Sequence, residues 1–138
     1  MKNNSVFIEK LRSSGLRLTK QRIKISEVLF NRKKTFHFTI AELNKILEGE
    51  LGKNFSLATI YNTVNAFKKK GYLKEISINS ENSYYDTNTS NHHHFYNEST
   101  KELIDLKGND ISNIIINKTI PRKKIKSIEV LVKIANRN

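Results

Sequence analysis

Three consecutive helix signals constrain the fold of this chain more than any other feature. Each signal contains a residue suited to capping the amino end of a helix. Thr19 lies near the start of the first segment, residues 16–30, and Ser56 begins the third. The second segment begins at Thr39, which forms a capping-box pattern with Glu42. Because each cap precedes an apolar stripe of helical period, we expect three helices in succession.

The third of these segments places apolar residues on one face of a helix and small or polar residues on the other. The apolar face comprises Leu57, Ile60, Val64 and Phe67. The outward face comprises Ala58, Thr59, Asn62, Thr63 and Asn65. Three lysines precede Gly71, which suits the carboxyl end of a helix. We therefore expect one buried and one solvent-facing side.

Two strand signals follow the third helix. Residues 72–78 and 83–87 are β-prone and flank the turn sequence NSEN. Three helices followed by a hairpin are typical of a winged helix-turn-helix domain. The predicted fold class is therefore α+β, with this DNA-binding domain at residues 1–86 and a small α/β domain at residues 87–138.

The second predicted domain has few elements from which to form a hydrophobic core. Residues 92–96 and 102–106 favour short strands, residues 110–118 a short helix, and residues 125–134 an alternating strand. Domains of this size usually need a covalent or metal staple or a partner chain. The chain has no cysteine, so we expect homodimerisation through residues 87–138. The alternative is a marginal subdomain that packs on the first.

The charge of the chain points to a polyanionic partner. Its 138 residues carry a net charge of +12, of which +8 falls within residues 1–86. Such a field favours nucleic acid or an anionic membrane surface. No apolar run is long enough to span a bilayer, and residues 1–15 lack the pattern of a signal peptide. We expect a cytoplasmic protein without disulfides, thiolate catalysis or Cys-ligated zinc.

In a helix-turn-helix, the amino-terminal residues of the second helix contact base edges. The candidate DNA-binding residues are Lys20, Arg22, Ser56, Ala58, Thr59, Tyr61, Asn62 and Lys68. Small side chains permit close approach, Asn62 could pair with adenine, and the cations could contact phosphates. The alternative places Tyr61 at the edge of the core and leaves the lysines as a solvated face.

Three consecutive histidines lie in the β-prone segment at residues 92–96. Residues two apart share a face of a strand, so His92 and His94 should point one way and His93 the other. A pair of histidines holds a metal weakly and needs further ligands. The candidates to complete the site are Asp86, Asp105 and His37.

Nitrogen and oxygen ligands favour Fe(II), Mn(II) or Zn(II) over Cu(I). A metal shared between the two predicted domains would favour one orientation of the DNA-binding domains in a dimer, as a switch requires. The alternative is a surface patch of histidines without a metal.

Three segments in this order resemble the ferric uptake regulator family: GLRLTKQRIKISEVL, SLATIYNTVNAFKKKGYLKEI and YDTNTSNHHHFY. The residues of the second and third segments, together with the absence of cysteine, most resemble the iron response regulator branch of this family. The resemblance implies a dimeric, cytoplasmic regulator of transcription that senses a metal or haem. It places a regulatory metal site on His37, Asp86, His92, His94 and Asp105. It also implies a base-contacting Tyr61 and haem binding by His92, His93 and His94.

The chain departs from the family in one respect. Where most members have a C-x-x-C pair after the histidine strand, this chain reads YNEST. The structural zinc that this pair holds in those members cannot form here. Haem binding would have to rest on the histidines.

We therefore expect a metal- or haem-responsive transcription regulator, mainly a repressor, of iron and haem genes that binds AT-rich inverted repeats as a dimer. A nonspecific architectural DNA-binding protein would explain the charge equally well. A metalloenzyme is a third reading, but the chain lacks H-E-x-x-H and the second domain leaves little room for a substrate pocket. We expect no enzyme activity.

Overall fold

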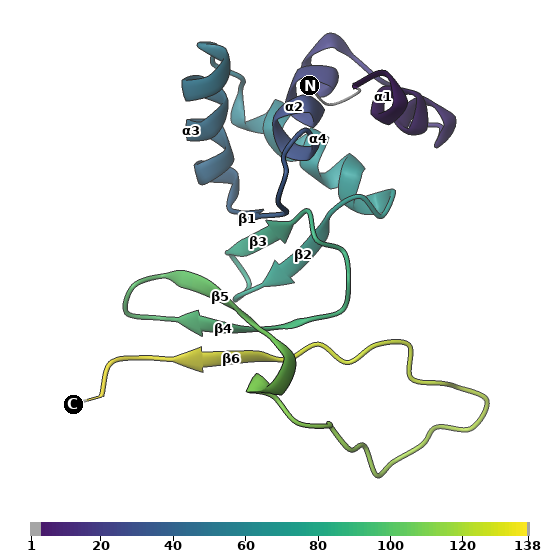
Figure 1. Cartoon of the computed structure of the whole chain (residues 1–138), viewed down its shortest axis with the longest axis vertical. Coiled ribbons are helices and arrows are strands. Elements are labelled where there is room, and N and C mark those ends of the chain that lie inside the picture. The colour runs from purple at the N-terminus through teal and green to yellow at the C-terminus, as the bar shows by residue number, and fades with distance from the viewer. Residues whose placement is uncertain (1–3, 138) are drawn as a thin grey trace. The chain divides into compact units, whose positions relative to one another are not determined.

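The computed structural model describes residues 4–137, which divide into two compact units, Met1–Thr89 and Ser90–Asn138. The first unit combines four helices with a small sheet (Figure 1). Its elements are α1 (Asn4–Ser13), α2 (Lys20–Phe30), β1 (His37–Phe38), α3 (Ile40–Leu51), α4 (Leu57–Lys69), β2 (Lys74–Ser77) and β3 (Ser83–Asp86). No helix within residues 4–137 is both long and apolar enough to cross a bilayer.

The three predicted N-caps are confirmed. The Thr19 hydroxyl accepts a hydrogen bond from the backbone amide of Arg22, so α2 begins at residue 20 rather than at 16. Thr39 and Glu42 form the reciprocal capping box at the start of α3. The Ser56 hydroxyl accepts from the amide of Thr59 and begins α4. Each cap satisfies a backbone donor that has no partner within its helix.

The sheet of the first unit has the strand order β1-β3-β2, with antiparallel neighbours. The predicted hairpin forms β2 and β3, while β1 was not predicted. Only two residues make up β1, and they pair directly with the end of β3: His37 with Asp86, and Phe38 with Tyr85. Two residues are too few to show a strand period in the sequence.

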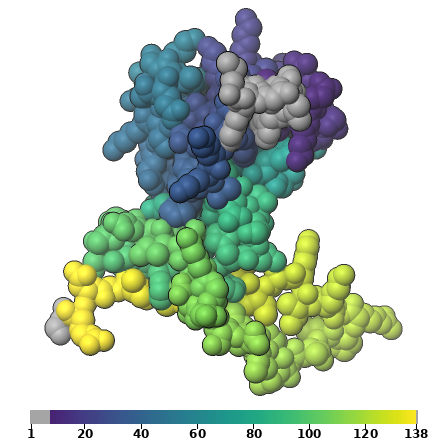
Figure 2. Space-filling model, in the orientation of Figure 1, coloured from purple at the N-terminus to yellow at the C-terminus, as the bar shows by residue number. Residues whose placement is uncertain are grey.

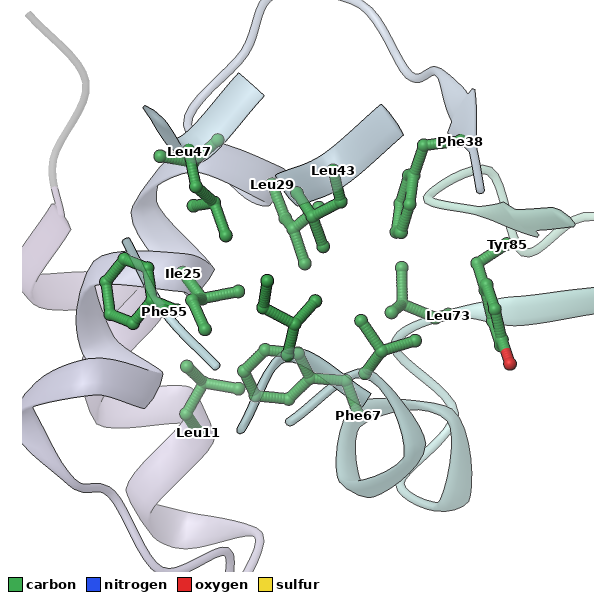
Figure 3. Close-up of a cluster of buried hydrophobic side chains, with 13 residues drawn as sticks. Leu11, Ile25, Leu29, Phe38, Leu43, Leu47, Phe55, Phe67, Leu73 and Tyr85 are labelled. Atoms are coloured by element: carbon green, nitrogen blue, oxygen red, sulfur yellow. The ribbon is translucent and has the colours of Figure 1, made fainter. Parts of the chain in front are cut away.

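The core of the first unit lies between the helices and the sheet (Figure 3). Its fully buried side chains include Leu11, Ile25, Leu29, Phe38, Leu43, Leu47, Ile60, Val64 and Phe67. Leu11 comes from α1, a helix that was not predicted. Two predictions for α4 were wrong: Leu57 is 59% exposed, and Thr63 is buried. The Thr63 hydroxyl donates to the carbonyl of Thr59, which removes the cost of its burial.

The second unit is built on a three-stranded sheet of order β5-β4-β6. Its elements are β4 (His93–Asn97), β5 (Glu102–Leu106), the 3-10 helix η1 (Gly108–Asp110) and β6 (Leu131–Ile134). The hairpin strands β4 and β5 are antiparallel, whereas β6 returns parallel to β4. Leu103 and Leu106 are the buried apolar side chains among residues 90–137, at 5% and 7% exposure, so this unit has little core of its own.

Residues 111–130 differ from the prediction. The α-helix expected at 110–118 is absent, and the 3-10 helix η1 ends at its first residue, Asp110. The strand expected at 125–134 is confined to residues 131–134. The intervening segment, yellow-green in Figure 2, is open to solvent. Its exposed isoleucines are Ile114, Ile115, Ile116, Ile120 and Ile125. The apolar alternation near the C-terminus therefore extends beyond the strand that forms.

Candidate metal centre and the exposed face of α4

His92 presents a ring nitrogen with a lone pair to the interior of the second unit. Its Nδ1 atom lies 2.8 Å from the carbonyl oxygen of Ser90. Because a carbonyl can only accept, Nδ1 carries the proton and Nε2 of the neutral ring does not. Nε2 lies 3.7 Å from Oδ1 of Asp105. Metal-binding histidines commonly have this outer hydrogen bond, which fixes the tautomer and the direction of the ring.

His94 converges on the same oxygen. It is buried on β4 and pairs directly with Asp105 on β5. Its Nε2 atom lies 3.2 Å from Oδ1 of Asp105, and its ring centroid lies 4.4 Å from that of His92. The prediction that His92 and His94 share a side is confirmed by these distances. His92 directly precedes β4 and still follows the alternation of the strand.

Asp105 completes a set of three ligand atoms within 4.8 Å of one another. Its Oδ1 atom is shielded from solvent and accepts no hydrogen bond from any residue between 4 and 137. A buried carboxylate oxygen without a donor is costly. The Nε2 lone pair of neutral His92, directed at this oxygen, adds repulsion unless a proton or a cation lies between them. Two imidazoles and one carboxylate suit Mn(II), Fe(II) or Zn(II), so the residues present fit a divalent metal ion.

His93 has the opposite arrangement. Its Nδ1 atom accepts a hydrogen bond of 2.9 Å from the backbone amide of Val130. The neutral ring therefore carries its proton on Nε2, which cannot bind a metal while this bond is intact. His93 instead ties β4 to the residue just before β6. No local sequence pattern indicates Val130 as its partner, since the two residues are 37 positions apart.

His37 and Asp86 lie together in the first unit. They are partners across β1 and β3, so their side chains emerge on the same face of the sheet. Asp86 is 2% exposed, and its carboxylate accepts a hydrogen bond of 2.8 Å from the amide of Asn88. The His37 ring meets the Tyr84 ring edge-on, with 5.7 Å between centroids.

The amino-terminal part of α4 presents an exposed face of small and polar side chains. Ser56, Ala58 and Asn62 are exposed, and Tyr61 is 51% exposed. About half of the Tyr61 side chain is therefore accessible to a partner, as a base-contacting role requires. Thr59 is half-buried, and its hydroxyl accepts a hydrogen bond from Ser56. Both of these side chains serve the helix cap.

The predicted cations differ in their surroundings. Lys20 is exposed at the start of α2. The Arg22 guanidinium donates to the carbonyl of Arg17. The ammonium of Lys68 forms an ion pair of 2.7 Å with Glu75 on β2. Glu75 was not predicted as a site residue, because the alternation of its strand does not indicate which helix residue it contacts.

Two pKa shifts mark the place where α4 meets the hairpin. Hydrogen bonds from Lys68 and then from Ser83 hold the pKa of Glu75 below its ordinary value. Burial, followed by the charge of Glu75, raises the pKa of Tyr85. Both shifts have local causes within the first unit. They indicate that the carboxylate of Glu75 is charged at neutral pH and the phenol of Tyr85 is not.

A model of the family described as the ferric uptake regulator family matches residues 13–135. The chain belongs to the ferric uptake regulator family. Members of this family are transcription regulators and not enzymes, which supports the prediction that the chain has no enzyme activity. The predicted family resemblance is confirmed.

Three similar proteins illustrate the relationship. The peroxide operon regulator of Bacillus subtilis is 36% identical over 99 residues, which are 72% of this chain and 66% of that protein. The ferric uptake regulator of Vibrio cholerae matches with a TM-score of 0.70 at 21% identity, over 93% of this chain and 98% of that one. The ferric uptake regulator of Pseudomonas aeruginosa, solved with manganese, matches with a TM-score of 0.69 at 20% identity, over 94% of this chain and 97% of that one.

These two structures support the mixed α and β fold in two units. The Bacillus subtilis protein is a peroxide operon regulator, so membership of the iron response regulator branch remains a prediction.

Proposed function

We propose that this protein is a metal-responsive, DNA-binding transcription regulator that acts mainly as a repressor. One observation carries the proposal: the Nε2 atoms of His92 and His94 converge on a buried Asp105 oxygen that accepts no hydrogen bond from residues 4–137. Such a set of ligand atoms is suited to holding a cation. The family assignment supplies the link from metal to transcription.

The proposed metal ligands are His92, His94 and Asp105, joined by Asp86 and His37. Asp86 precedes His92 by six residues, and His37 is its partner across β1 and β3. A bound divalent ion would neutralise the carboxylates and link the chain before residue 89 to the chain after it. It would favour one arrangement of the DNA-binding parts, which is the differential affinity that a switch requires. Mn(II) and Fe(II) are the preferred ions, with Zn(II) as a further candidate.

Haem is the less favoured ligand. The hydrogen bond from Val130 keeps the proton of neutral His93 on Nε2. Haem ligation through Nε2 of His93 would break this bond, so a haem proposal rests on His92 and His94 alone. The similarity to a peroxide operon regulator makes peroxide a further signal to test, beside the predicted control of iron and haem genes.

The proposed DNA-binding unit is a winged helix at residues 1–86 with α4 as its recognition helix. Support comes from the exposure of Ala58, Tyr61 and Asn62 near its amino end. In a helix-turn-helix these are the positions that meet base edges in the major groove. Asn62 suits adenine, and an AT-rich inverted repeat is the proposed target. Lys20 and Arg22 at the start of α2 are proposed phosphate contacts.

Homodimerisation through residues 87–138 is the proposed assembly. Support comes from the five exposed isoleucines between residues 114 and 125, of which Ile115 is 77% exposed. Soluble monomers rarely expose so many large apolar side chains in one segment. Ile115→Lys should shift the protein from dimer to monomer in sedimentation analysis, whereas Ile23→Lys on α2 should not. An unchanged dimer would exclude this segment from the interface.

The test of the proposed function is fluorescence anisotropy on an AT-rich inverted-repeat duplex and on a scrambled duplex of the same composition. The protein is measured metal-free, with Mn(II), with anaerobic Fe(II), with Fe(II) followed by peroxide, and with haem. We expect Mn(II) or Fe(II) to raise the affinity for the inverted repeat alone. Equal binding of both duplexes under every condition would instead indicate an architectural DNA-binding protein.

A further inference from the structure

The carboxylate of Glu75 joins three elements of the first unit. It lies on β2 and uses both of its oxygens. Oε1 accepts a hydrogen bond of 2.7 Å from the Lys68 ammonium in the last turn of α4. Oε2 accepts a hydrogen bond of 2.6 Å from the Ser83 hydroxyl at the start of β3. Charge-assisted bonds of this length are strong, and their donors come from two elements that are separate in the sequence.

This arrangement changes the expected role of Lys68. The sequence places it among the phosphate contacts, but its ammonium is occupied and its charge is balanced by the carboxylate. Its neighbour Lys69 is exposed at the same end of α4. A lysine contributes to nonspecific DNA binding only insofar as its charge is available to replace counterions on the phosphates. Two adjacent lysines should therefore behave differently toward DNA.

We propose that Glu75 is a specificity-determining and positioning residue: it withholds the Lys68 charge from DNA and fastens the end of α4 to the β2–β3 hairpin. This inference rests on the proposed DNA-binding function of the first unit. Its consequence is that the acidic residue improves discrimination by lowering affinity for nonspecific duplex. Wherever protein and DNA meet through a strongly basic surface, each withheld cation reduces sequence-independent binding.

The test uses salt titrations of anisotropy on the scrambled duplex, with the full chain, four single variants and one double variant. Glu75→Gln keeps the size of the side chain and removes the charge. The matched control is Glu81→Gln, which removes the same charge from the exposed tip of the hairpin. We expect Glu75→Gln to raise affinity for the scrambled duplex several-fold and to steepen the salt dependence by about 0.9, the increment for one added phosphate contact. Glu81→Gln should leave the slope unchanged.

Lys68 and Lys69 complete the test. Lys69→Gln should reduce the slope by about 0.9, whereas Lys68→Gln should leave it nearly unchanged. In the double variant Lys68→Gln/Glu75→Gln the slope should return to that of the wild type, which a purely structural effect of Glu75→Gln would not produce. The proposal is overturned if Glu75→Gln and Glu81→Gln behave alike, or if Lys68→Gln and Lys69→Gln do.

Because these measurements use the scrambled duplex, they remain valid even if the wild type shows no preferred sequence. Absence of a preferred sequence would instead refute the proposed regulatory function. The ratio of affinities for inverted repeat and scrambled duplex is recorded in parallel. We expect Glu75→Gln to lower this ratio several-fold, and an unchanged ratio would refute the specificity role.

Discussion

The Nε2 atom of His94 lies 3.2 Å from the Oδ1 atom of Asp105, and the two residues are direct partners across β4 and β5. The register of the hairpin therefore determines which carboxylate meets which imidazole. If β5 slipped by one residue, Asp105 would turn to the face of the sheet opposite to that of His94. The short loop between the two strands thus contributes to the proposed metal centre through the register that it sets.

Asp105→Asn should abolish most of the stabilisation by metal. At a Mn(II) concentration about 100 times the dissociation constant, ligand linkage should stabilise the wild type by about 2.7 kcal/mol. Thermal unfolding with and without Mn(II) measures this effect. Asp110→Asn, which removes the same charge from η1, should retain the full shift. An equal shift in Asp105→Asn and the wild type would exclude Asp105 as a ligand.

His93→Ala should destabilise the second unit without weakening metal binding. It removes the acceptor of the Val130 amide, at a cost of about 1 kcal/mol. Hydrogen exchange at Val130 should accelerate in His93→Ala. His93→Asn, whose amide oxygen can take the place of Nδ1, should recover part of the protection. Unchanged exchange in the alanine variant would show that the bond does not hold this segment.

Ile60→Ala and Leu57→Ala should separate packing from surface function on α4. Ile60 is fully buried, so its truncation should cost about 2–5 kcal/mol of unfolding free energy. Leu57 is exposed, and its truncation should stay within about 0.5 kcal/mol. Urea unfolding of both variants distinguishes these outcomes. A large loss in Leu57→Ala would contradict the assignment of its side chain to the solvent face.

Asn62→Ala should reduce sequence discrimination rather than overall affinity for DNA. A side chain that reads a base edge contributes about 1–3 kcal/mol of discrimination. The ratio of affinities for inverted repeat and scrambled duplex should fall accordingly, and Tyr61→Ala should also lower it. Lys69→Gln should weaken binding to both duplexes equally. If Asn62→Ala and Tyr61→Ala both keep full discrimination, another element reads the sequence.

The contribution of Glu75 to stability should depend on pH. Its pKa is lower in the folded protein, chiefly because of the hydrogen bond from Lys68. The stabilisation is therefore present above the pKa of Glu75 in the unfolded chain, about 4.3, and is lost as the pH falls through its pKa in the folded protein. Glu75→Gln should be less stable than the wild type by up to about 1 kcal/mol at pH 7. This difference should shrink below pH 4.3, as urea titrations at several pH values would reveal; a constant difference would contradict the ion pair.

Local signals in the sequence predicted much of the first unit. Capping by Thr19, Thr39 and Ser56 depends on residues at most three positions apart, so the pattern is visible in the sequence. The side chain of Thr63 was misplaced because its buried hydroxyl is satisfied by a backbone carbonyl. Polarity alone does not reveal such a bond. The two-residue strand β1 depends on pairing with β3 and has no period of its own.

The second unit was harder to predict because long-range contacts define it. Alternation indicated that His92 and His94 share a side, and Asp105 was a candidate ligand because it lies on the neighbouring predicted strand. The role of His93 depends on Val130, a contact that no local pattern encodes. The apolar alternation in residues 125–130 predicted more strand than forms, since only residues 131–134 pair with β4. Likewise, the pairing of Lys68 with Glu75 follows from how the helix packs on the hairpin.

In the proposed metal centre, His92 and His94, and not His93, couple a metal ion to DNA binding. The decisive experiment is a Mn(II) titration of affinity for the inverted repeat in His92→Asn, His93→Asn and His94→Asn. Asparagine keeps a polar group near the Nδ1 position and removes Nε2. We predict that the metal response persists in His93→Asn and is lost in the other two variants. An equal response in all three, or its loss in His93→Asn alone, would contradict the proposed centre.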